Sequence, residues 1–218
     1  MKKIFFILFI LSLLENLTES INNPSYYSNL IGKVRKELVY RSLLHLPKRN
    51  DINFLKMVLE LIQIKEDNSF NDTESAYFIY KWICNNIELE KNNGSREALK
   101  TNELGKGDYK GISLLFSKIC SYFNLESNII KEDSRIGLND TRNYVKIDNE
   151  YYLIDIPYTI IYKEIESISF YKDLFFGTEP SVFINYHFPS ESKWQLLQSP
   201  ITNAQYKYMV KINPNFHY

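Results

Sequence analysis

A glycine-rich turn leads directly into an apolar helix in the middle of the chain, over residues 105–120. Enzymes that use a cysteine nucleophile often place it at the first residue of such a helix, because the backbone N–H groups that converge there favour a thiolate. The residue at this position is Tyr109. The sequence therefore predicts the frame of a thiol active site from which the reactive sulfur is missing.

Other nearby residues are poorly placed to replace that thiol. Tyr109 is a weak acyl nucleophile, because an unperturbed phenol has a pKa of about 10. Cys120 lies about 16 Å from the start of the helix, at a rise of about 1.5 Å per residue. We expect Ser113, one turn into the helix, to point into packing. Cys84 and Cys120 either form a disulfide or remain buried free thiols.

Three acidic residues, Asp108, Asp140 and Asp155, offer a different chemistry. One interpretation groups them as an acid–base or metal-binding cluster, since paired carboxylates carry such reactions. The other has Asp155 hydrogen-bonded to Tyr109 or to backbone, with the other two carboxylates in solvent. Two neighbouring carboxylates would repel each other and raise the pKa of one of them. The 2 cysteines and 3 scattered histidines predict neither a zinc site nor a cofactor site.

The elements that position these residues predict an α+β fold. Before and through the glycine-rich turn, apolar residues recur at helical spacing, and after it they alternate as in a β-hairpin. The predicted helices cover residues 28–46, 51–64 (capped by Asp51), about 72–87 (capped by Asp72 or Thr73), 95–102, 109–123 and 170–176. The predicted strands cover residues 128–130, 142–148, 151–156 and 182–186, with a two-residue turn at 149–150. We expect Trp82 and Trp194 to anchor the core.

The N-terminus has the pattern of a secretory signal peptide. Lys2 and Lys3 precede an apolar run over residues 4–14, and Thr18 and Ser20 have the spacing of a cleavage site. An uncleaved anchor is the alternative, but the run is short for a membrane span. We therefore predict a signal peptide at residues 1–20, a helical extension at 21–66 and one domain at 67–218. The mature protein would be secreted or lumenal, or periplasmic in a bacterium, with no membrane attachment after cleavage.

The overall charge excludes one class of partner. The chain has 26 basic and 26 acidic residues and a formal net charge of zero, without a basic patch. Nucleic acid is therefore not an expected partner.

Taken in order, several short stretches resemble the transglutaminase-like superfamily, and most closely its kyphoscoliosis-peptidase type. The helix at residues 79–87 resembles the one that precedes the active site in that family. Gly105, Gly107 and Gly111 match the glycines around its nucleophile, and residues 145–148 and 151–155 match its hairpin. A downstream block is also similar, at residues 175–180, 187–189 and 194–197. The resemblance covers about residues 71–208 and implies a papain-related fold, with a central helix packed on an antiparallel sheet.

The same resemblance implies a degenerate catalytic triad. The family places its cysteine two residues before the glycine that matches Gly111, and that position is Tyr109. Its histidine begins a His-Ala-Trp-Asn run; aligning the final Asn with Asn143 puts Asp140 where the histidine belongs. The third member, an aspartate, is retained as Asp155. We therefore predict a secreted pseudoenzyme that binds an unidentified protein or peptide.

Two alternatives stay open. One is a hydrolase with a relocated active site that uses Asp140 and Asp155, or His187. A structure with His187 close to Asp155 and to a serine or cysteine would favour it, although we expect His187 and its block to be structural. The other is a purely structural secreted domain that uses its N-terminal helices as an interaction surface.

Overall fold

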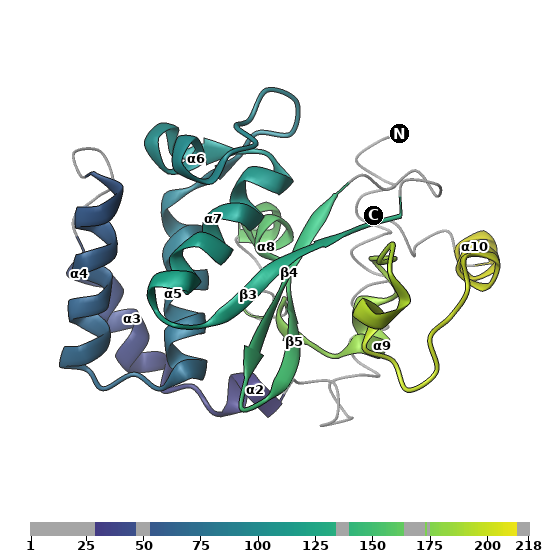
Figure 1. The fold of residues 1–218 in the computed structure, drawn as a ribbon, viewed down its shortest axis with the longest axis horizontal. Coiled ribbons are helices and arrows are strands. Elements are labelled where there is room, and N and C mark those ends of the chain that lie inside the picture. Colours follow the sequence, from purple (N-terminus) through teal and green to yellow (C-terminus); the bar gives the residue numbers. More distant parts are fainter. Residues whose placement is uncertain (1–28, 47–52, 134–139, 164–172, 174, 213–218) are drawn as a thin grey trace.

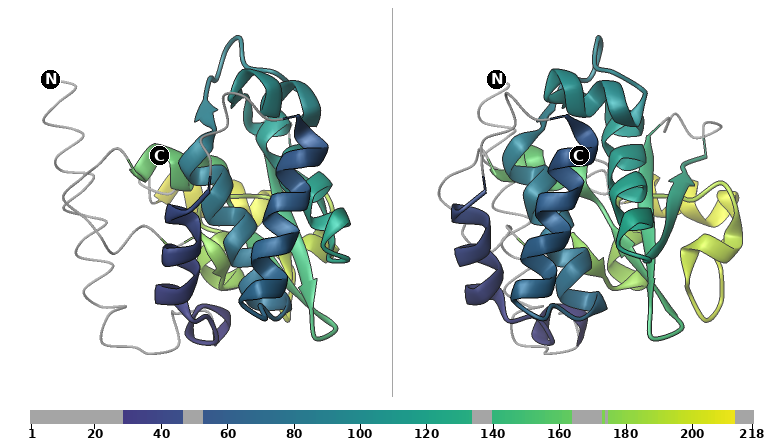
Figure 2. Two further views of the ribbon diagram at one scale, coloured as in Figure 1. Left: turned by 90° about the vertical axis from the view of Figure 1, so that its left-hand side faces the viewer. Right: turned by 60° about the vertical axis from the view of Figure 1, so that its left-hand side comes forward.

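The computed structural model describes residues 29–46, 53–133, 140–163, 173 and 175–212. A group of helices packs against one face of an antiparallel sheet, as Figures 1 and 2 show, which confirms the predicted α+β class. The helices are α2 (Asn29–Gly32), α3 (Lys36–Leu44), α4 (Phe54–Asp67), α5 (Asp72–Asn86), α6 (Ala98–Leu104), α7 (Tyr109–Tyr122), α8 (Ile156–Lys163), α9 (Pro180–Phe183), α10 (Asn203–Ile212) and the 3-10 helix η5 (Ser192–Gln195). The predicted signal peptide lies outside the described residues.

The sheet has the strand order β3-β4-β5-β6, and each neighbouring pair is antiparallel. Its strands are β3 (Glu126–Lys131), β4 (Thr141–Ile147), β5 (Glu150–Ile154) and β6 (Phe176–Thr178). The central helix α7 packs against β3 and β4, as expected. A separate short parallel pair joins β1 (Glu88–Leu89) to β2 (Lys106–Gly107), and this pair holds the chain just before α7.

The helix α5 forms the centre of the helical layer. Its N-cap is Asn71 rather than the predicted Asp72 or Thr73: the Asn71 side chain accepts from the Glu74 backbone N–H, and Glu74 accepts from the Asn71 N–H in return. Trp82 is 1 % exposed and anchors the core, as predicted. The reciprocal cap formed by Asn71 and Glu74 is favoured because it satisfies two free backbone donors at once.

The helix predicted over residues 28–46 is interrupted at Arg35. The backbone N–H of Arg35 and its guanidinium all donate to the Glu74 carboxylate, with the guanidinium Nε at 2.5 Å. Arg35 has a non-helical backbone (φ −75°, ψ 71°) and precedes α3 as its N-cap. A long-range ion pair therefore splits one periodic segment into α2 and α3, and helical spacing alone gives no sign of it.

The N-terminal helices share the core of the rest of the chain. Leu30, Val39 and Leu61 belong to the same buried cluster as Phe116 of α7 and Val145 of β4. The last of these helices, α4, begins after Asn53, whose side chain caps it; the predicted cap Asp51 lies outside the described residues.

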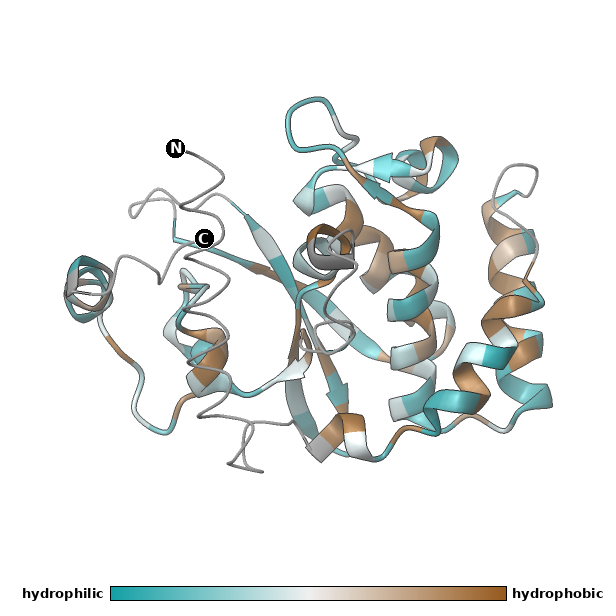
Figure 3. Cartoon of the chain, turned by 180° about the vertical axis from the view of Figure 1, so that it is seen from behind, coloured by the Kyte–Doolittle hydropathy of each residue, from teal (hydrophilic) through white to brown (hydrophobic). Residues whose placement is uncertain are grey.

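Some leucines of these helices remain in solvent. Leu44, Leu55 and Leu59 are 80 %, 54 % and 65 % exposed, and the hydrophobic colour on α4 is visible at the right margin of Figure 3. Within the described residues, no helix is long and apolar enough to cross a membrane.

The hairpin turn lies one residue earlier than predicted. Ile147 pairs with Glu150, so the turn residues are Asp148 and Asn149. Both have a positive φ, 53° and 64°, as a tight hairpin with the right-handed strand twist requires. Asp and Asn tolerate that conformation better than most residues, which explains why this pair forms the turn.

Two predictions for the C-terminal part are wrong. Residues 182–186, predicted as a strand, lie in and after the helix α9, which begins with Pro180 at its first turn. The last residue of the helix predicted over 170–176, Phe176, instead begins the strand β6, which pairs with β5, while residues 170–172 and 174 lie outside the described residues. Trp194 stacks on Tyr144 at 4.3 Å between ring centroids, so it anchors a small cluster on the other face of the sheet.

Candidate functional site

The glycine-rich turn places Tyr109 at the first residue of α7, as predicted. Asp108 caps the helix: its Oδ1 accepts from the Gly111 backbone N–H at 2.8 Å. Gly105 ends α6 in the left-handed conformation, with φ 70°. At Gly111 a Cβ atom would overlap the carbonyl oxygen of Ser95, so the close approach of that loop to α7 requires glycine.

The ring of Tyr109 is half-buried between two cations. The guanidinium carbon of Arg142 lies 5.2 Å from the ring centroid, and Lys91 Nζ lies 6.0 Å from it. Burial and the negative charge of Asp140 raise the pKa of the Tyr109 phenol, although Lys91 and Arg142 act in the opposite direction. A phenol whose pKa is raised is protonated at neutral pH, so it is not an activated nucleophile.

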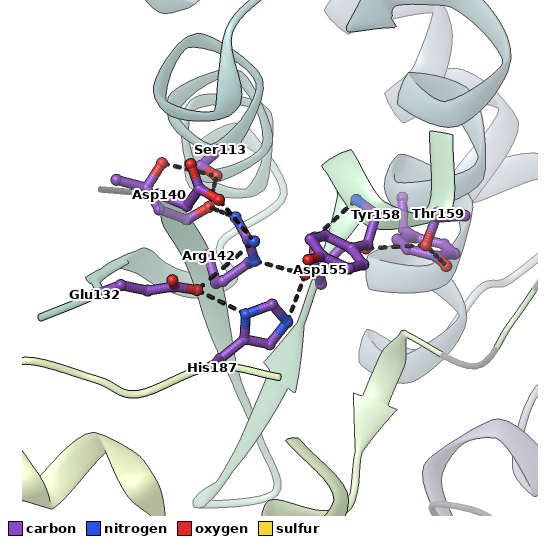
Figure 4. A network of polar contacts seen from close by, with 10 residues as sticks. Ser113, Glu132, Asp140, Arg142, Asp155, Tyr158, Thr159 and His187 are labelled. Atoms are coloured by element: carbon purple, nitrogen blue, oxygen red, sulfur yellow. Dashed lines mark hydrogen bonds and ion pairs between the residues drawn. The ribbon is translucent and has the colours of Figure 1, made fainter. Parts of the chain in front are cut away.

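Arg142 of β4 lies at the centre of the site, and its side chain is 1 % exposed (Figure 4). Its Nε lies 2.5 Å from Asp155 Oδ2, and its Nη1 donates to the Thr141 carbonyl at 2.9 Å. Its Nη2 lies 3.4 Å from Asp140 and 3.6 Å from Glu132. Burial alone would lower the pKa of the guanidinium, but the three carboxylates together raise it.

Arg142 also lies between two aromatic rings. Its guanidinium carbon is 5.2 Å from the Tyr109 centroid and 5.0 Å from that of Tyr158 in α8. Both distances are in the range of a cation–π interaction. The guanidinium therefore fills the space between the start of α7 and the end of β5, where Asp155 lies.

His187 adds an imidazole to the same cluster. Its Nδ1 lies 2.6 Å from Glu132 Oε1 and its Nε2 lies 2.9 Å from Asp155 Oδ2. Burial and the charge of Arg142 lower the pKa of the imidazole, but the two carboxylates outweigh them and the net pKa is raised. The raised pKa favours the imidazolium form, whose charge is attracted to both carboxylates.

Asp155 receives both cations on one oxygen. Its Oδ1 accepts from the backbone N–H of Tyr158 at 2.9 Å, which confirms the predicted bond to backbone. The Oδ2 contacts to Arg142 Nε and His187 Nε2 are short, but they lie off the direction of a hydrogen bond. They therefore act as ion pairs. Burial would raise the pKa of this carboxyl, but the two cations hold it below its usual range.

The three predicted acidic residues do not form one carboxylate cluster. Arg142 separates Asp140 from Asp155, and Asp108 caps α7 with Arg96 at 3.2 Å. The pKa of Asp140 is raised, as repulsion predicts, but burial is the larger cause. The interpretation that Asp108 and Asp140 lie in solvent is wrong, because one caps a helix and the other faces a buried guanidinium.

The remaining candidate nucleophiles are buried in packing. Ser113 is fully buried and donates to the Thr141 carbonyl, as its position in the helix predicts. Cys84 and Cys120 are buried free thiols rather than a disulfide, and burial raises the pKa of the Cys120 thiol. Among the described residues, no set of three His, Cys, Asp or Glu side chains has the arrangement of a metal site.

Three members of the buried cluster escaped the sequence analysis: Arg142, Glu132 and Tyr158. Of these three, only Arg142 could have been suspected from the sequence, because an arginine in a strand whose neighbouring residues are buried needs a buried partner. Asn143 also has a role that its type alone does not reveal. Its Nδ2 donates to the Ser113 carbonyl and to Ser117 Oγ, both at 2.9 Å, and so ties β4 to α7.

Comparison with known proteins finds a distant similarity to one group of curated proteins. No protein-family profile matches it. The kyphoscoliosis peptidases of Mus musculus and Homo sapiens are each 23 % identical to it over an alignment of 168 residues, and the match covers 68 % of this chain. The chain spans about a quarter of their length, 25 %. A solved structure, the crystal structure of a TGase, matches with a TM-score of 0.38 at 11 % sequence identity. The match covers 56 % of this chain and 36 % of the TGase chain, and a similarity this low carries no argument. The chain is therefore distantly similar to kyphoscoliosis peptidase, a relationship that agrees with the transglutaminase-like resemblance of its motifs.

Proposed function

We propose that this chain is a secreted, transglutaminase-like pseudoenzyme that acts by binding a protein or peptide. One observation supports this most: a guanidinium occupies the space between Tyr109 and Asp155. If Tyr109 and Asp140 stand at the family's cysteine and histidine positions, Arg142 stands at its tryptophan. The chain would then lack both the thiol and the base, and a fixed cation would cover the one retained carboxylate.

The chemistry of the cluster agrees with this proposal. Acyl transfer needs a nucleophile and a base that can reach it. His187 is the only described imidazole at this site, and both of its nitrogens face carboxylates. Within the described part of the chain, none of its hydrogen-bond or ion-pair partners is a hydroxyl or a thiol. This argues against the alternative of a hydrolase that uses His187, and the pairing of Asp140 and Asp155 with Arg142 argues against an acid–base pair.

The first test measures catalysis directly. Purified protein should neither hydrolyse a fluorogenic peptide nor incorporate a fluorescent amine into a glutamine-containing protein. The matched variants are Tyr109→Phe, which removes only the hydroxyl, and Asp155→Ala, with folding checked by circular dichroism. Activity that does not depend on a thiol and that either variant abolishes would refute the proposal.

A second test asks whether the missing groups can be restored. The double variant Tyr109→Cys, Asp140→His returns a thiol and an imidazole, but Arg142 still pairs with Asp155 and lowers the pKa of any neighbouring imidazole. We expect the double variant to remain inactive on the fluorogenic peptide at pH 7, because the guanidinium keeps Asp155 from orienting the new imidazole, and to gain activity when Arg142→Trp is added. Activity in the double variant would contradict the role given to Arg142.

Secretion is part of the same proposal and has its own measurement. When the chain is expressed in a secreting host, N-terminal sequencing of the mature protein should begin near Ile21. A mature protein that still begins at Met1 would contradict the signal peptide.

A further inference from the structure

Within the described residues, part of the sheet edge at β3 has no strand paired with it. Figure 1 shows β3 at the margin of the sheet, beside α7. Glu132 N–H donates to the Asp140 carbonyl, toward β4, whereas the Lys131 carbonyl accepts from Ser190 N–H on the opposite side. Because backbone groups alternate in direction along a strand, Ser127 and Ile129 point the same way as Lys131, away from β4.

The chain itself shows that this edge accepts a strand. Residues 188–190 run antiparallel to the end of β3: Asp133 N–H donates to the Phe188 carbonyl and Ser190 N–H donates to the Lys131 carbonyl, both at 2.9 Å. After Ser190 the chain leaves the edge and enters η5. The next positions along the same line, beside Ser127 and Ile129, have no strand against them among the described residues.

A side chain protects the open part of the edge. The Ile129 backbone N–H donates to the Oδ1 of Asn128 at 2.8 Å. Asn128 is exposed, so this bond can be exchanged for another at little cost to the fold. Edge strands are commonly protected against unwanted pairing in such ways.

We propose that β3 binds an extended peptide segment of another protein, rich in β-branched residues, as an additional antiparallel strand. Such a strand would continue the line that residues 188–190 begin, and it would replace Asn128 as the acceptor for the Ile129 N–H. This inference rests on the proposed binding function and names its surface and its class of partner.

The geometry favours a peptide over a second copy of the chain. In each copy, residues 188–190 already occupy the edge beyond Lys131. Two copies could therefore pair only through the short stretch around Ser127 and Ile129, whereas a flexible peptide can adjust its path on either side. Side chains that suit a strand beside Ile129 are β-branched, such as Val and Thr.

The probe for this surface is an end-capped heptapeptide of alternating Thr and Val, added to the whole protein. In NMR spectra, the amide signals of Ser127 and Ile129 should shift, and hydrogen exchange at Ile129 should slow. The matched control peptide carries N-methyl groups on the backbone nitrogens that would face β3, and it should not bind. Equal binding of both peptides would overturn the proposal.

The decisive protein variant is Asn128→Ala, because it removes the competing acceptor without touching a buried group. We expect it to bind the probe about two- to ten-fold more tightly, the change that follows from the net value of one hydrogen bond. Unchanged or weaker binding would overturn the inference, and so would dimerisation through β3 in place of peptide binding. NMR shifts confined to the region of Tyr109 would refute binding at β3 but leave the proposed binding function intact. Catalytic activity would refute the proposed pseudoenzyme but leave peptide binding at β3 intact.

Discussion

The substitution Arg142→Met tests the role of the buried cation most directly. Methionine is unbranched and flexible, so it keeps the apolar stem of the arginine side chain, although it ends short of the guanidinium that lies between Tyr109 and Tyr158. It removes the positive charge that faces Asp155, Glu132 and Asp140. The loss therefore includes the contacts of the guanidinium with the two rings, and a double-mutant cycle separates the pairing with Asp155 from them.

The expected loss follows from what remains buried. Asp155 is 0 % exposed, and breaking a buried ion pair by removing one partner costs about 3–5 kcal/mol. His187 partly compensates, because Arg142 lowers the pKa of the imidazole and its removal lets the ring hold its proton more firmly. We therefore expect the free energy of unfolding to fall by about 3 kcal/mol, a large part of the roughly 5–15 kcal/mol of a typical domain.

Urea unfolding at pH 7, followed by tryptophan fluorescence, gives this quantity. The control is Lys146→Met, the same kind of change on the same strand, at a lysine that is 30 % exposed and lies 3.5 Å from Glu126. It should cost less than about 1 kcal/mol. A double-mutant cycle combines Arg142→Met with Asp155→Asn. The free energies of unfolding lost by the two single variants should together exceed the loss of the double variant by at least about 1 kcal/mol. The reasoning fails if Arg142→Met costs no more than the control, or if the two losses simply add.

Three further predictions concern stability. The pKa of His187 is raised on folding, so its stabilisation is full below a pH of about 6.5 and is lost as the pH rises through the folded value; urea midpoints measured from pH 6 to 9 should fall, and His187→Gln should flatten that decline. Gly111→Ala should cost more than about 2 kcal/mol, because its methyl group would overlap a backbone carbonyl, whereas Gly32→Ala, with open space around it, should be neutral or stabilising in thermal melts. Asn71→Ala should lower the free energy of unfolding by about 1 kcal/mol in urea, and an unchanged midpoint would show that the cap contributes nothing.

The local parts of the fold could be predicted because short-range rules determine them. The start of α7 at Tyr109 follows from the glycines and from Asp108, and the hairpin follows from alternation and a turn-forming pair. The errors arise where a distant group changes a local preference. Arg35 stops a helix because it meets Glu74, which is 39 residues away in the sequence. No window of neighbouring residues contains that information.

The C-terminal errors have a related cause. Residues 182–186 alternate well enough to suggest a strand, but Pro180 starts a helix there and Phe183 reaches the buried cluster below the sheet. The apolar spacing of such a short segment fits both the helical and the strand period, and tertiary packing decides between helix and strand. His187 comes just after this helix, so an incorrect strand would also have misplaced the imidazole.

The cluster around Arg142 shows why a buried ionic network is harder to predict than the elements that frame it. The sequence indicates Asp155 and offers Tyr109, the backbone or His187 as its partner, but it gives no reason to choose Arg142. The actual partners, Arg142 and His187, are 13 and 32 residues from Asp155 and come from different elements. Yet one physical requirement holds for any such residue: a buried carboxylate must find a positive charge or lose its own. A fixed guanidinium meets that requirement at every pH at which the protein is folded, which an imidazole alone cannot do. The pairing with a permanent cation therefore explains how Asp155 can stay charged in the core.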